Sequence, residues 1–150
     1  MLQRKGIDDV AVRFSKCCSP IPGDEIIGFV TRGRGVSIHR TDCINVLNLP
    51  EMERARLIDA EWQQDKDKVN ERYIAEINIY SANRNGMLAE ITRVLTEKNV
   101  SILTMNVRTS KTGTATTSVS FEVSNKEELN NVIDRLRNID DIIDIERTTG

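Results

Sequence analysis

All three cysteines and the single histidine of this 150-residue chain lie between residues 17 and 43. Thiolate sulfur and imidazole nitrogen are the donors that zinc prefers, usually as a tetrahedral set of four. The candidates, which we call the Cys/His cluster, are Cys17, Cys18, His39 and Cys43. His39 and Cys43 are four residues apart, so they would share a face if a helix begins there. The residue types therefore point to a closed Cys₃His zinc site.

The spacing of Cys17 and Cys18 departs from common zinc motifs, in which at least two residues separate paired ligands. Adjacent residues of a regular strand point to opposite faces, so both thiols could reach one ion only if the backbone breaks there. The sequence SPIPGD directly downstream favours a loop. Two interpretations stay open, a zinc site and three buried free cysteines that act as small hydrophobic side chains. A catalytic thiol would need a base and an orienting group nearby.

Basic residues accompany the cluster. Residues 1–49 contain seven Lys/Arg and five Asp/Glu, although the whole chain has a formal charge of −2. Arg32, Arg34 and Arg40 lie on or beside a predicted hairpin, whose glycine-rich turn covers residues 31–35. An exposed hairpin with arginines can follow a phosphate backbone, so we identify these three as candidate RNA contacts. The alternative is a solvated turn with no partner.

The second half of the chain has a regular pattern. Alternating apolar residues predict strands, and apolar residues at i, i+3 and i+4 predict helices. The predicted strands cover residues 73–79, 102–108, 114–123 and 143–145, and the predicted helices cover 87–95 and 125–136. The order β-α-β-β-α-β is that of ferredoxin-like folds. Each helix has one apolar stripe, so both should pack on the same face of the sheet.

The first half is predicted to be a small β-rich module. Strands are expected at residues 10–14, 25–30, 36–39 and 57–62, with a short helix at 43–47 capped by Thr41 or Asp42. Residues 63–72 (QQDKDKVNER) are polar and charged, which is typical of a linker. We therefore predict an α+β protein with a Cys/His module at 1–62, a linker at 63–72 and a ferredoxin-like domain at 73–150.

Several classes of protein are not supported. No apolar run approaches the length of a membrane span, and the first ten residues do not resemble a secretory signal. Three cysteines are too few for a disulfide scaffold, which favours a cytoplasmic protein. Neither a phosphate-binding GxxxxGK[ST] motif nor a GxSxG motif occurs, so we expect no catalysis by this chain.

Two longer sequence runs resemble those of a known protein family. The runs RFSKCCSPIPGD (13–24) and GFVTRGRGVSIHRTDC (28–43), with a match extending through Trp62, resemble the C-terminal region of the long RelA/SpoT proteins, which make and hydrolyse (p)ppGpp in the stringent response. The second half is similar to the ACT domain that ends those proteins. The resemblance implies a zinc-finger or ribosome-intersubunit module at 1–62, followed by an ACT domain, with the catalytic domains of the parent lying upstream.

The resemblance also implies partners and sites. The four cluster residues occupy the family's Cys/His positions, and the module contacts ribosomal RNA and the tRNA-bound ribosome, which favours the role of the three arginines. ACT domains often form side-by-side homodimers and bind amino acids at the first strand–helix turn. The matching positions are Asn83, Asn85, Gly86, Met87 and Leu88. Many ACT domains have Asp where Asn83 stands, and its loss removes a carboxylate that could hold a ligand ammonium.

The leading hypothesis is a non-catalytic regulatory region that docks a (p)ppGpp synthetase/hydrolase on the ribosome and relays that state to the catalytic domains. The first alternative is a sensor that binds a branched-chain or other amino acid at the ACT turn. The second alternative is a dimerisation module. Zinc is the one cofactor that the residues suggest.

Overall fold

The computed structural model describes residues 2–4, 11–33, 35–62 and 72–148. The chain divides into two compact units, one within residues 1–71 and the other comprising Arg72–Thr148. The linker predicted at 63–72 lies outside the described residues except for Arg72. Each unit is described below by itself.

The first unit is built on a five-stranded sheet with the order β1-β5-β3-β4-β2. The strands are β1 (Leu2–Arg4), β2 (Val12–Phe14), β3 (Ile26–Val30), β4 (Val36–Arg40) and β5 (Leu57–Trp62). The predicted hairpin is present, because β3 pairs antiparallel with β4 across the turn at 31–35. The sequence did not indicate that β2 would pair with β4 in parallel.

The sheet of the first unit is strongly curved. The rings of Phe14 on β2 and Trp62 on β5 stack at 5.4 Å between centroids, although two other strands separate β2 from β5 in the sheet. The curved sheet encloses a small apolar cluster around Ile26, Val36 and Ile38. Space is tight at Gly28, because an added Cβ there would lie 2.9 Å from Ile58 Cγ1 and one of the two groups would have to shift.

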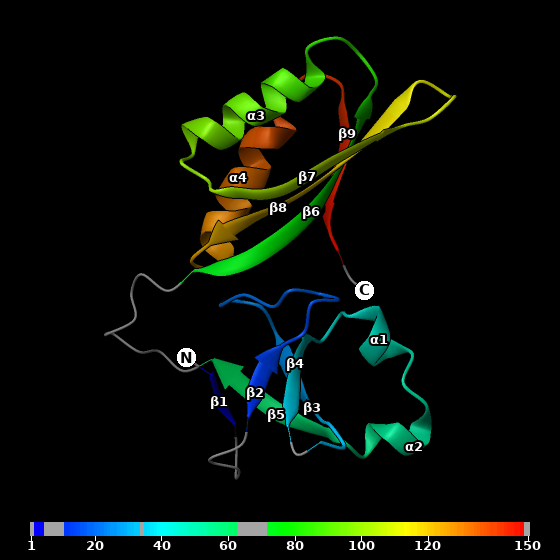
Figure 1. Ribbon diagram of the computed structural model, residues 1–150, viewed down its shortest axis with the longest axis vertical. Helices are drawn as coiled ribbons and strands as arrows, with labels where there is room; N and C mark the ends of the chain where they lie inside the picture. The colour runs from blue at the N-terminus through cyan, green and yellow to red at the C-terminus, as the bar shows by residue number, and fades with distance from the viewer. Residues whose placement is uncertain (1, 5–10, 34, 63–71, 149–150) are drawn as a thin grey trace. The chain divides into compact units, whose positions relative to one another are not determined.

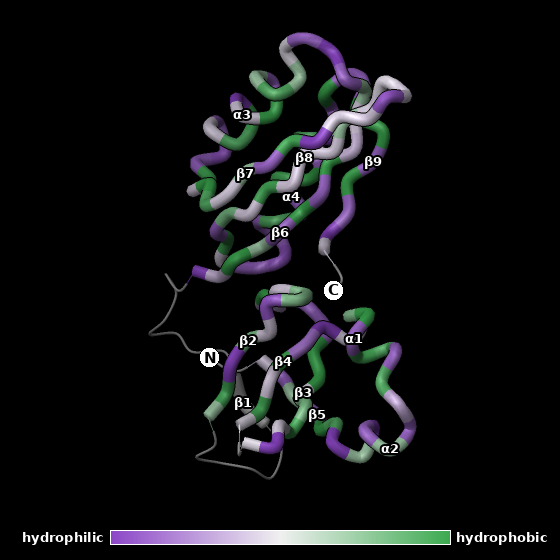
Figure 2. Tube along the Cα trace, turned by 45° about the vertical axis from the view of Figure 1, so that its right-hand side comes forward, coloured by the Kyte–Doolittle hydropathy of each residue, from purple (hydrophilic) through white to green (hydrophobic). Residues whose placement is uncertain are grey.

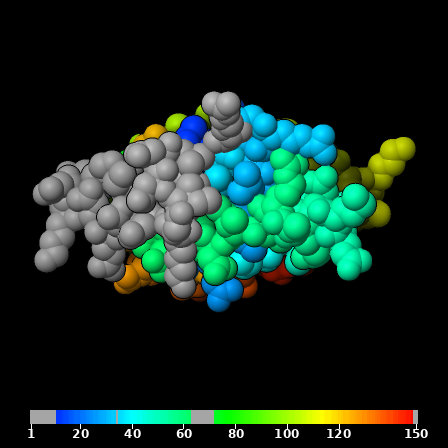
Figure 3. Space-filling view, turned by 90° about the horizontal axis from the view of Figure 1, so that it is seen from below, coloured from blue at the N-terminus to red at the C-terminus, as the bar shows by residue number. Residues whose placement is uncertain are grey.

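Two one-turn helices follow β4 (Figure 1), namely α1 (Ile44–Leu47) and α2 (Glu51–Arg54). The residue at the N-cap of α1 is Cys43, without a side-chain hydrogen bond, and not Thr41 or Asp42 as the sequence suggested. Asp42 instead accepts hydrogen bonds from Arg40. The segment that carries α1 and α2 lies at the surface of the unit (teal in Figure 3), where Leu47 and Met52 are exposed.

The second unit has the predicted β-α-β-β-α-β order. Its elements are β6 (Tyr73–Ala82), α3 (Met87–Glu97), β7 (Ile102–Thr109), β8 (Thr114–Val123), α4 (Lys126–Arg137) and β9 (Ile142–Arg147). The antiparallel sheet has the order β7-β8-β6-β9. Both helices lie on the same side of this sheet (Figure 1), which confirms the ferredoxin-like prediction.

The core of the second unit is formed by the residues that the two-residue period of strands and the i, i+3, i+4 pattern of helices place on one face. Alternate residues of β6 and β8 and the inner stripes of α3 and α4 are buried. Figure 2 shows hydrophobic and hydrophilic residues taking turns along α3. The buried side chains include Ile77, Ile79, Ile91, Leu95, Val119, Phe121, Leu129 and Leu136. Apolar burial of this kind supplies most of the driving force for folding.

The start of α4 confirms the predicted cap. Asn125 Oδ1 accepts a hydrogen bond from the backbone N–H of Glu128 at 2.8 Å. Glu128 reaches back to accept the backbone N–H of Ser124 at 2.9 Å, one residue earlier than in a standard capping box. In the described part of the chain, neither α4 nor any other helix is long and apolar enough to cross a membrane.

Candidate metal centre and ligand sites

The structure brings the four cluster residues together from three segments. Cys17 and Cys18 come from the loop after β2, His39 from β4 and Cys43 from the N-cap of α1. The chain turns at residues 16–18, and Ser19 then takes a positive φ of 47°. This is the backbone break that two adjacent ligands require, since it lets both thiols face the same point.

The distances among the donor atoms fit a tetrahedral metal site. Cys17 Sγ lies 3.4 Å from Cys43 Sγ, 4.0 Å from Cys18 Sγ and 3.4 Å from His39 Nδ1. All four donor atoms lie within 4.8 Å of one another. Zn–S bonds of about 2.3 Å in a tetrahedron place sulfur atoms about 3.8 Å apart. The cluster could therefore bind a metal ion of the zinc type.

The surroundings of the cluster are apolar. Cys18 is 1 % exposed and Cys43 is fully buried. The buried side chain of Val46 packs with these two cysteines, and the partly buried Ile27 and Leu57 pack against them. Burial alone would explain free cysteines as small hydrophobic side chains. It does not explain why a third thiol and a ring nitrogen converge on the same point, which is the arrangement that metal ligands need.

Burial shifts the pKa values of the residues in the Cys/His cluster. It raises the pKa of the Cys18 and Cys43 thiols, because the thiolate loses solvation. Burial also lowers the pKa of His39, which favours the neutral imidazole. For Cys17, burial acts to raise the pKa, but hydrogen bonds from Ser15 and Asn45 bring it below its ordinary value. Cys17 is thus the thiol that most readily becomes a thiolate when no metal is bound.

Sequence reasoning missed the hydrogen-bonding groups behind the cluster. Ser15 Oγ lies 2.9 Å from Cys17 Sγ, and Ser37 Oγ lies 3.1 Å from His39 Nε2. Each serine stands two residues before the ligand that it contacts. On β4 that spacing places Ser37 and His39 on the same face of a strand, so the two-residue period was a usable signal.

The three candidate RNA-contacting arginines have different environments. The side chain of Arg32 is 85 % exposed at the hairpin turn and lies 3.6 Å from Glu53. Arg34 lies outside the described residues. The side chain of Arg40 is only 6 % exposed and donates to the Asp42 carboxylate and the Cys18 carbonyl oxygen. Arg40 therefore ties the cysteine loop to the end of β4, and Arg32 is the better placed to meet a phosphate.

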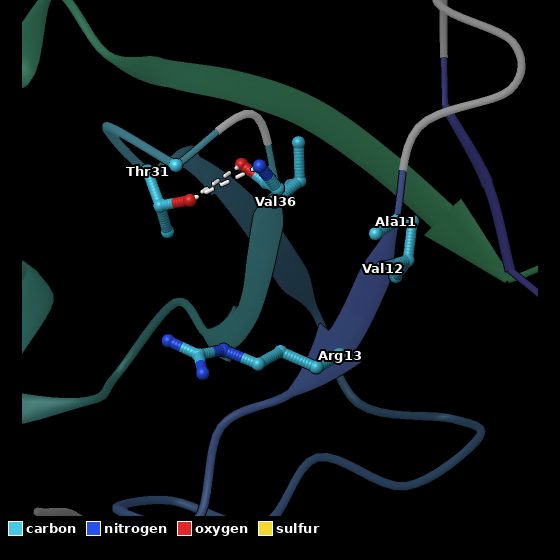
Figure 4. Close-up of a pocket in the computed structure, with 7 residues that line it drawn as sticks. Ala11, Val12, Arg13, Thr31 and Val36 are labelled. Carbon is cyan, nitrogen blue, oxygen red and sulfur yellow. Dashed lines mark hydrogen bonds between the residues drawn. The ribbon is translucent and has the colours of Figure 1, made fainter.

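An open hollow of about 430 Å³ lies beside the same hairpin turn. It is lined by Ala11, Val12, Arg13, Thr31, Gly33, Gly35 and Val36. Figure 4 shows the Thr31 hydroxyl bonded to the backbone of Gly35, which closes the turn, and the long side chain of Arg13 extending from β2. The turn is thus held by its own hydrogen bonds, and Arg13 contributes a basic side chain to the lining of the hollow.

The five candidate ligand-binding residues lie in the turn after β6, which contains Asn83, Asn85 and Gly86, and at the start of α3, which contains Met87 and Leu88. Gly86, the N-cap of α3, has a φ of 83° and no side-chain cap. Apart from its chain neighbours and the backbone of the helix, no atom of the described residues lies within 4 Å of the position where a Cβ would be. Asn83 and Asn85 are exposed, as is Leu88 at 45 %. Met87 is 5 % exposed and belongs to the core, so its side chain does not face this surface.

Arg84 at the centre of this turn was not singled out from the sequence. Its guanidinium makes ion pairs with Asp141 and Glu90 and donates to the carbonyl oxygen of Asp140 at 2.9 Å. These contacts tie the turn to the start of β9 and to the first turn of α3. The turn is therefore held in place without a bound ligand.

Comparison with known proteins agrees with the architecture. Residues 69–147, more than half of the chain, match the ACT domain family, which is the class defined by the second unit. Residues 2–63 match the RelA/SpoT RIS domain. The chain therefore belongs to the RelA/SpoT family, with a RIS domain followed by an ACT domain, and the resemblance seen in the sequence is confirmed.

Named relatives cover nearly the whole chain. The GTP pyrophosphokinase of Streptomyces coelicolor is 39 % identical over 97 % of this chain and 17 % of the relative. The bifunctional (p)ppGpp synthase/hydrolase RelA of Mycobacterium tuberculosis is 35 % identical over 97 % of this chain and 19 % of the relative. The crystal structure of the ACT domain from Chlorobium tepidum GTP pyrophosphokinase has a TM-score of 0.47 and 28 % identity, covering 51 % of this chain and 99 % of that one. The chain thus spans less than a fifth of the length of the Streptomyces and Mycobacterium relatives.

Proposed function

We propose that the chain is a non-catalytic regulatory region of a cytoplasmic GTP pyrophosphokinase or (p)ppGpp synthetase/hydrolase. In this proposal residues 1–62 dock on the ribosome, residues 63–72 act as a linker, and residues 73–150 form the ACT domain that passes the docked state to upstream catalytic domains. The observation that carries it is the match of a RIS domain and an ACT domain to successive parts of one chain.

Ribosome docking is assigned to the first unit and its basic hairpin. The exposure of Arg32 supports a contact with ribosomal RNA, while the ion pair and burial of Arg40 support a structural task for that residue. The test is cosedimentation of the chain with tRNA-bound ribosomes at several salt concentrations. Arg32→Glu combined with Arg34→Glu is expected to weaken binding at least tenfold, since charge reversal replaces attraction to phosphate with repulsion.

The control for this test is Arg93→Glu, which makes the same type of charge change at an exposed site on α3. It should bind as the unchanged chain does. Equal binding by the hairpin variant would remove these arginines from the proposal, and no binding by the unchanged chain would remove ribosome docking by this region.

The Cys/His cluster is proposed to hold one zinc ion through Cys17, Cys18, His39 and Cys43. The convergence of four donor atoms within 4.8 Å supports this assignment. Zinc would supply a rigid cross-link between the cysteine loop, β4 and α1, with no catalytic step. The test is the metal content of the purified chain together with a titration of the apo form, for which one ion per chain is expected. A chain that binds no zinc would contradict the assignment.

Amino-acid sensing is a second candidate for the ACT domain. The open space at Gly86 and the absence of a side-chain cap on α3 favour it, because backbone N–H groups at a helix start can receive a carboxylate. A ligand at one hundred times its Kd adds about 2.7 kcal/mol of stability. A thermal-melt screen against the twenty amino acids should then show a selective shift of several degrees, and no shift would remove this function.

The matched pair for that screen is Gly86→Val and Gly113→Val. Both glycines have a positive φ, 83° and 85°, and among the residues that the structure describes neither would bring a Cβ within 4 Å of another group. Both variants should therefore lose similar stability from backbone strain. Only the Gly86 variant should lose the ligand-induced shift.

Side-by-side dimerisation through the ACT domain is the proposal for assembly. Strand β7 is at an edge of its sheet and exposes Ile102 by 38 %, Leu103 by 46 % and Val107 by 40 %. An exposed apolar edge strand is a template for pairing with another chain. Light scattering should give a dimer that Leu103→Lys weakens, whereas a monomer at all concentrations would contradict the proposal.

A further inference from the structure

The ring of His39 lies between the three thiols and a serine. Its Nδ1 is 3.4 Å from Cys17 Sγ and 3.9 Å from Cys18 Sγ, whereas its Nε2 is 3.1 Å from Ser37 Oγ. A neutral imidazole has one nitrogen with a lone pair for a metal and one N–H that needs an acceptor. The two ring nitrogens therefore face chemically different partners that match these two needs.

Ser37 is held in place by the fold. It precedes His39 by two residues on β4, so the two side chains leave the same face of the strand. The pairing of β4 with β3, in which Ser37 is opposite Phe29 and His39 opposite Ile27, fixes their spacing. Ser37 is 7 % exposed, so bulk water has little access to take over its hydrogen bond.

The thiols have partners of the opposite kind. The backbone N–H of Arg40 donates to Cys18 Sγ at 3.3 Å, and the Ser15 hydroxyl lies 2.9 Å from Cys17 Sγ. Donors to thiolate sulfur help to stabilise the negative charge that a metal ligand carries. Ser37 differs from them because it faces the nitrogen of the ring that points away from the thiols, where an acceptor is needed.

We propose that Ser37 is a positioning residue, which accepts the Nε2–H of His39 and so leaves Nδ1 as the metal-binding atom. This inference rests on the proposed zinc site and adds which ring nitrogen binds the ion and what selects it. Partners behind the ligands typically contribute a factor of ten to one hundred to metal affinity.

The tautomer can be observed directly, because His39 is the only histidine in the chain. Long-range ¹⁵N–¹H NMR spectra of the zinc-loaded 150-residue protein give one set of ring signals. The expected result is a protonated Nε2 and a metal-bound Nδ1. Zinc bound through Nε2 would overturn the inference and leave the zinc site intact, whereas a chain that binds no zinc would remove both.

Substitution provides an independent test. The affinity for Zn²⁺ is measured by competition with a chromophoric chelator, and the Co²⁺ absorption spectrum reports the ligand geometry. Ser37→Ala should bind zinc ten to one hundred times more weakly, while Ser37→Thr, which keeps the hydroxyl, should stay close to the unchanged chain. Equal affinity for the alanine variant and the unchanged chain would overturn the inference, as would a threonine variant as weak as the alanine variant.

Discussion

The two units of this protein differ in the size and composition of their buried interiors. Most of the largest fully buried side chains among the described residues lie in the second unit, where long strands and two amphipathic helices enclose them. The first unit has strands of three to six residues, two one-turn helices and an interior that includes Cys18 and Cys43. The second unit has an ordinary apolar core. The first unit has a smaller apolar core, and beside it lies the Cys/His cluster.

The difference indicates where a metal ion would matter. A small domain buries a smaller share of its apolar surface than a large one does, and metal sites commonly compensate. Trp62 allows the two units to be followed separately, because it is the single tryptophan and its indole Nε1 donates to the Asp24 carbonyl oxygen within the first unit. Its fluorescence therefore reports the first unit, while far-UV circular dichroism reports both.

The largest expected effect is that of removing the proposed zinc ion. Structural zinc contributes on the order of 10 kcal/mol to the folding of zinc-finger peptides. A strong chelator should therefore abolish or greatly lower the melting transition seen by Trp62 fluorescence, and Cys43→Ser should prevent its recovery with added zinc. The melting temperature of the second unit, measured by circular dichroism, should not change.

The control for this experiment is the unchanged chain with the chelator already saturated by zinc. A Trp62 transition that does not respond to chelation would show that the first unit needs no metal. It would also remove the contrast between the two units.

The reverse experiment removes a core side chain of the second unit. Phe121 is fully buried, and Phe121→Ala should lower the free energy of unfolding by about 3–5 kcal/mol, because it leaves a cavity. Circular dichroism should show the second-unit transition at a much lower temperature, with the Trp62 transition unmoved. An equal shift in both probes would show that the units unfold as one.

A smaller effect is expected from crowding the interior of the first unit. The added methyl of Gly28→Ala would meet Ile58 Cγ1 at 2.9 Å and Val36 Cγ1 at 3.0 Å, which should destabilise the unit by about 1–3 kcal/mol. Gly33→Ala is the matched control, since in the described part of the chain nothing beyond its neighbours lies within 4 Å of the added Cβ. Urea unfolding followed by Trp62 fluorescence measures both, and equal stability of the two variants would contradict the tight packing at Gly28.

The smallest effect concerns the cap of α4. Burial acts to raise the pKa of Glu128, but hydrogen bonds from Ser124 and the charge of Arg72 bring it below its ordinary value of 4.5. The unfolded chain thus binds more protons there, so the stabilisation is fully present above pH about 4.5 and is lost as the pH falls through the folded pKa. Glu128→Gln should lower stability by about 1 kcal/mol at pH 7 and flatten this acid dependence.

Urea unfolding between pH 3 and 7, followed by circular dichroism, measures that change. Glu127→Gln is the matched control, with the same loss of charge in the same helical turn. An identical pH dependence for the two variants would exclude a special role for Glu128.

Regular periodicity explains what could be predicted from the sequence. The strands and helices of the second unit follow from alternation along β6 and β8 and from the apolar stripe of α4, because one face of each element is buried. The capping signal of Asn125 and Glu128 is also local. In the first unit, the β3–β4 hairpin was predicted from its glycine-rich turn. The parallel pairing of β2 with β4 and the helix α2 have no comparable local signal.

The residue types by themselves determined that Cys17, Cys18, His39 and Cys43 could bind zinc and that the second half forms a ferredoxin-like domain, since donor chemistry and periodicity are properties of the chain. Only the tertiary structure decided that the four donors converge, because the turn at residues 16–18 and the register of β3 with β4 bring distant segments together. It also decided that Arg40 is buried against Asp42 while Arg32 faces solvent. Side chains of the same type acquire different tasks because the fold gives each a different neighbour.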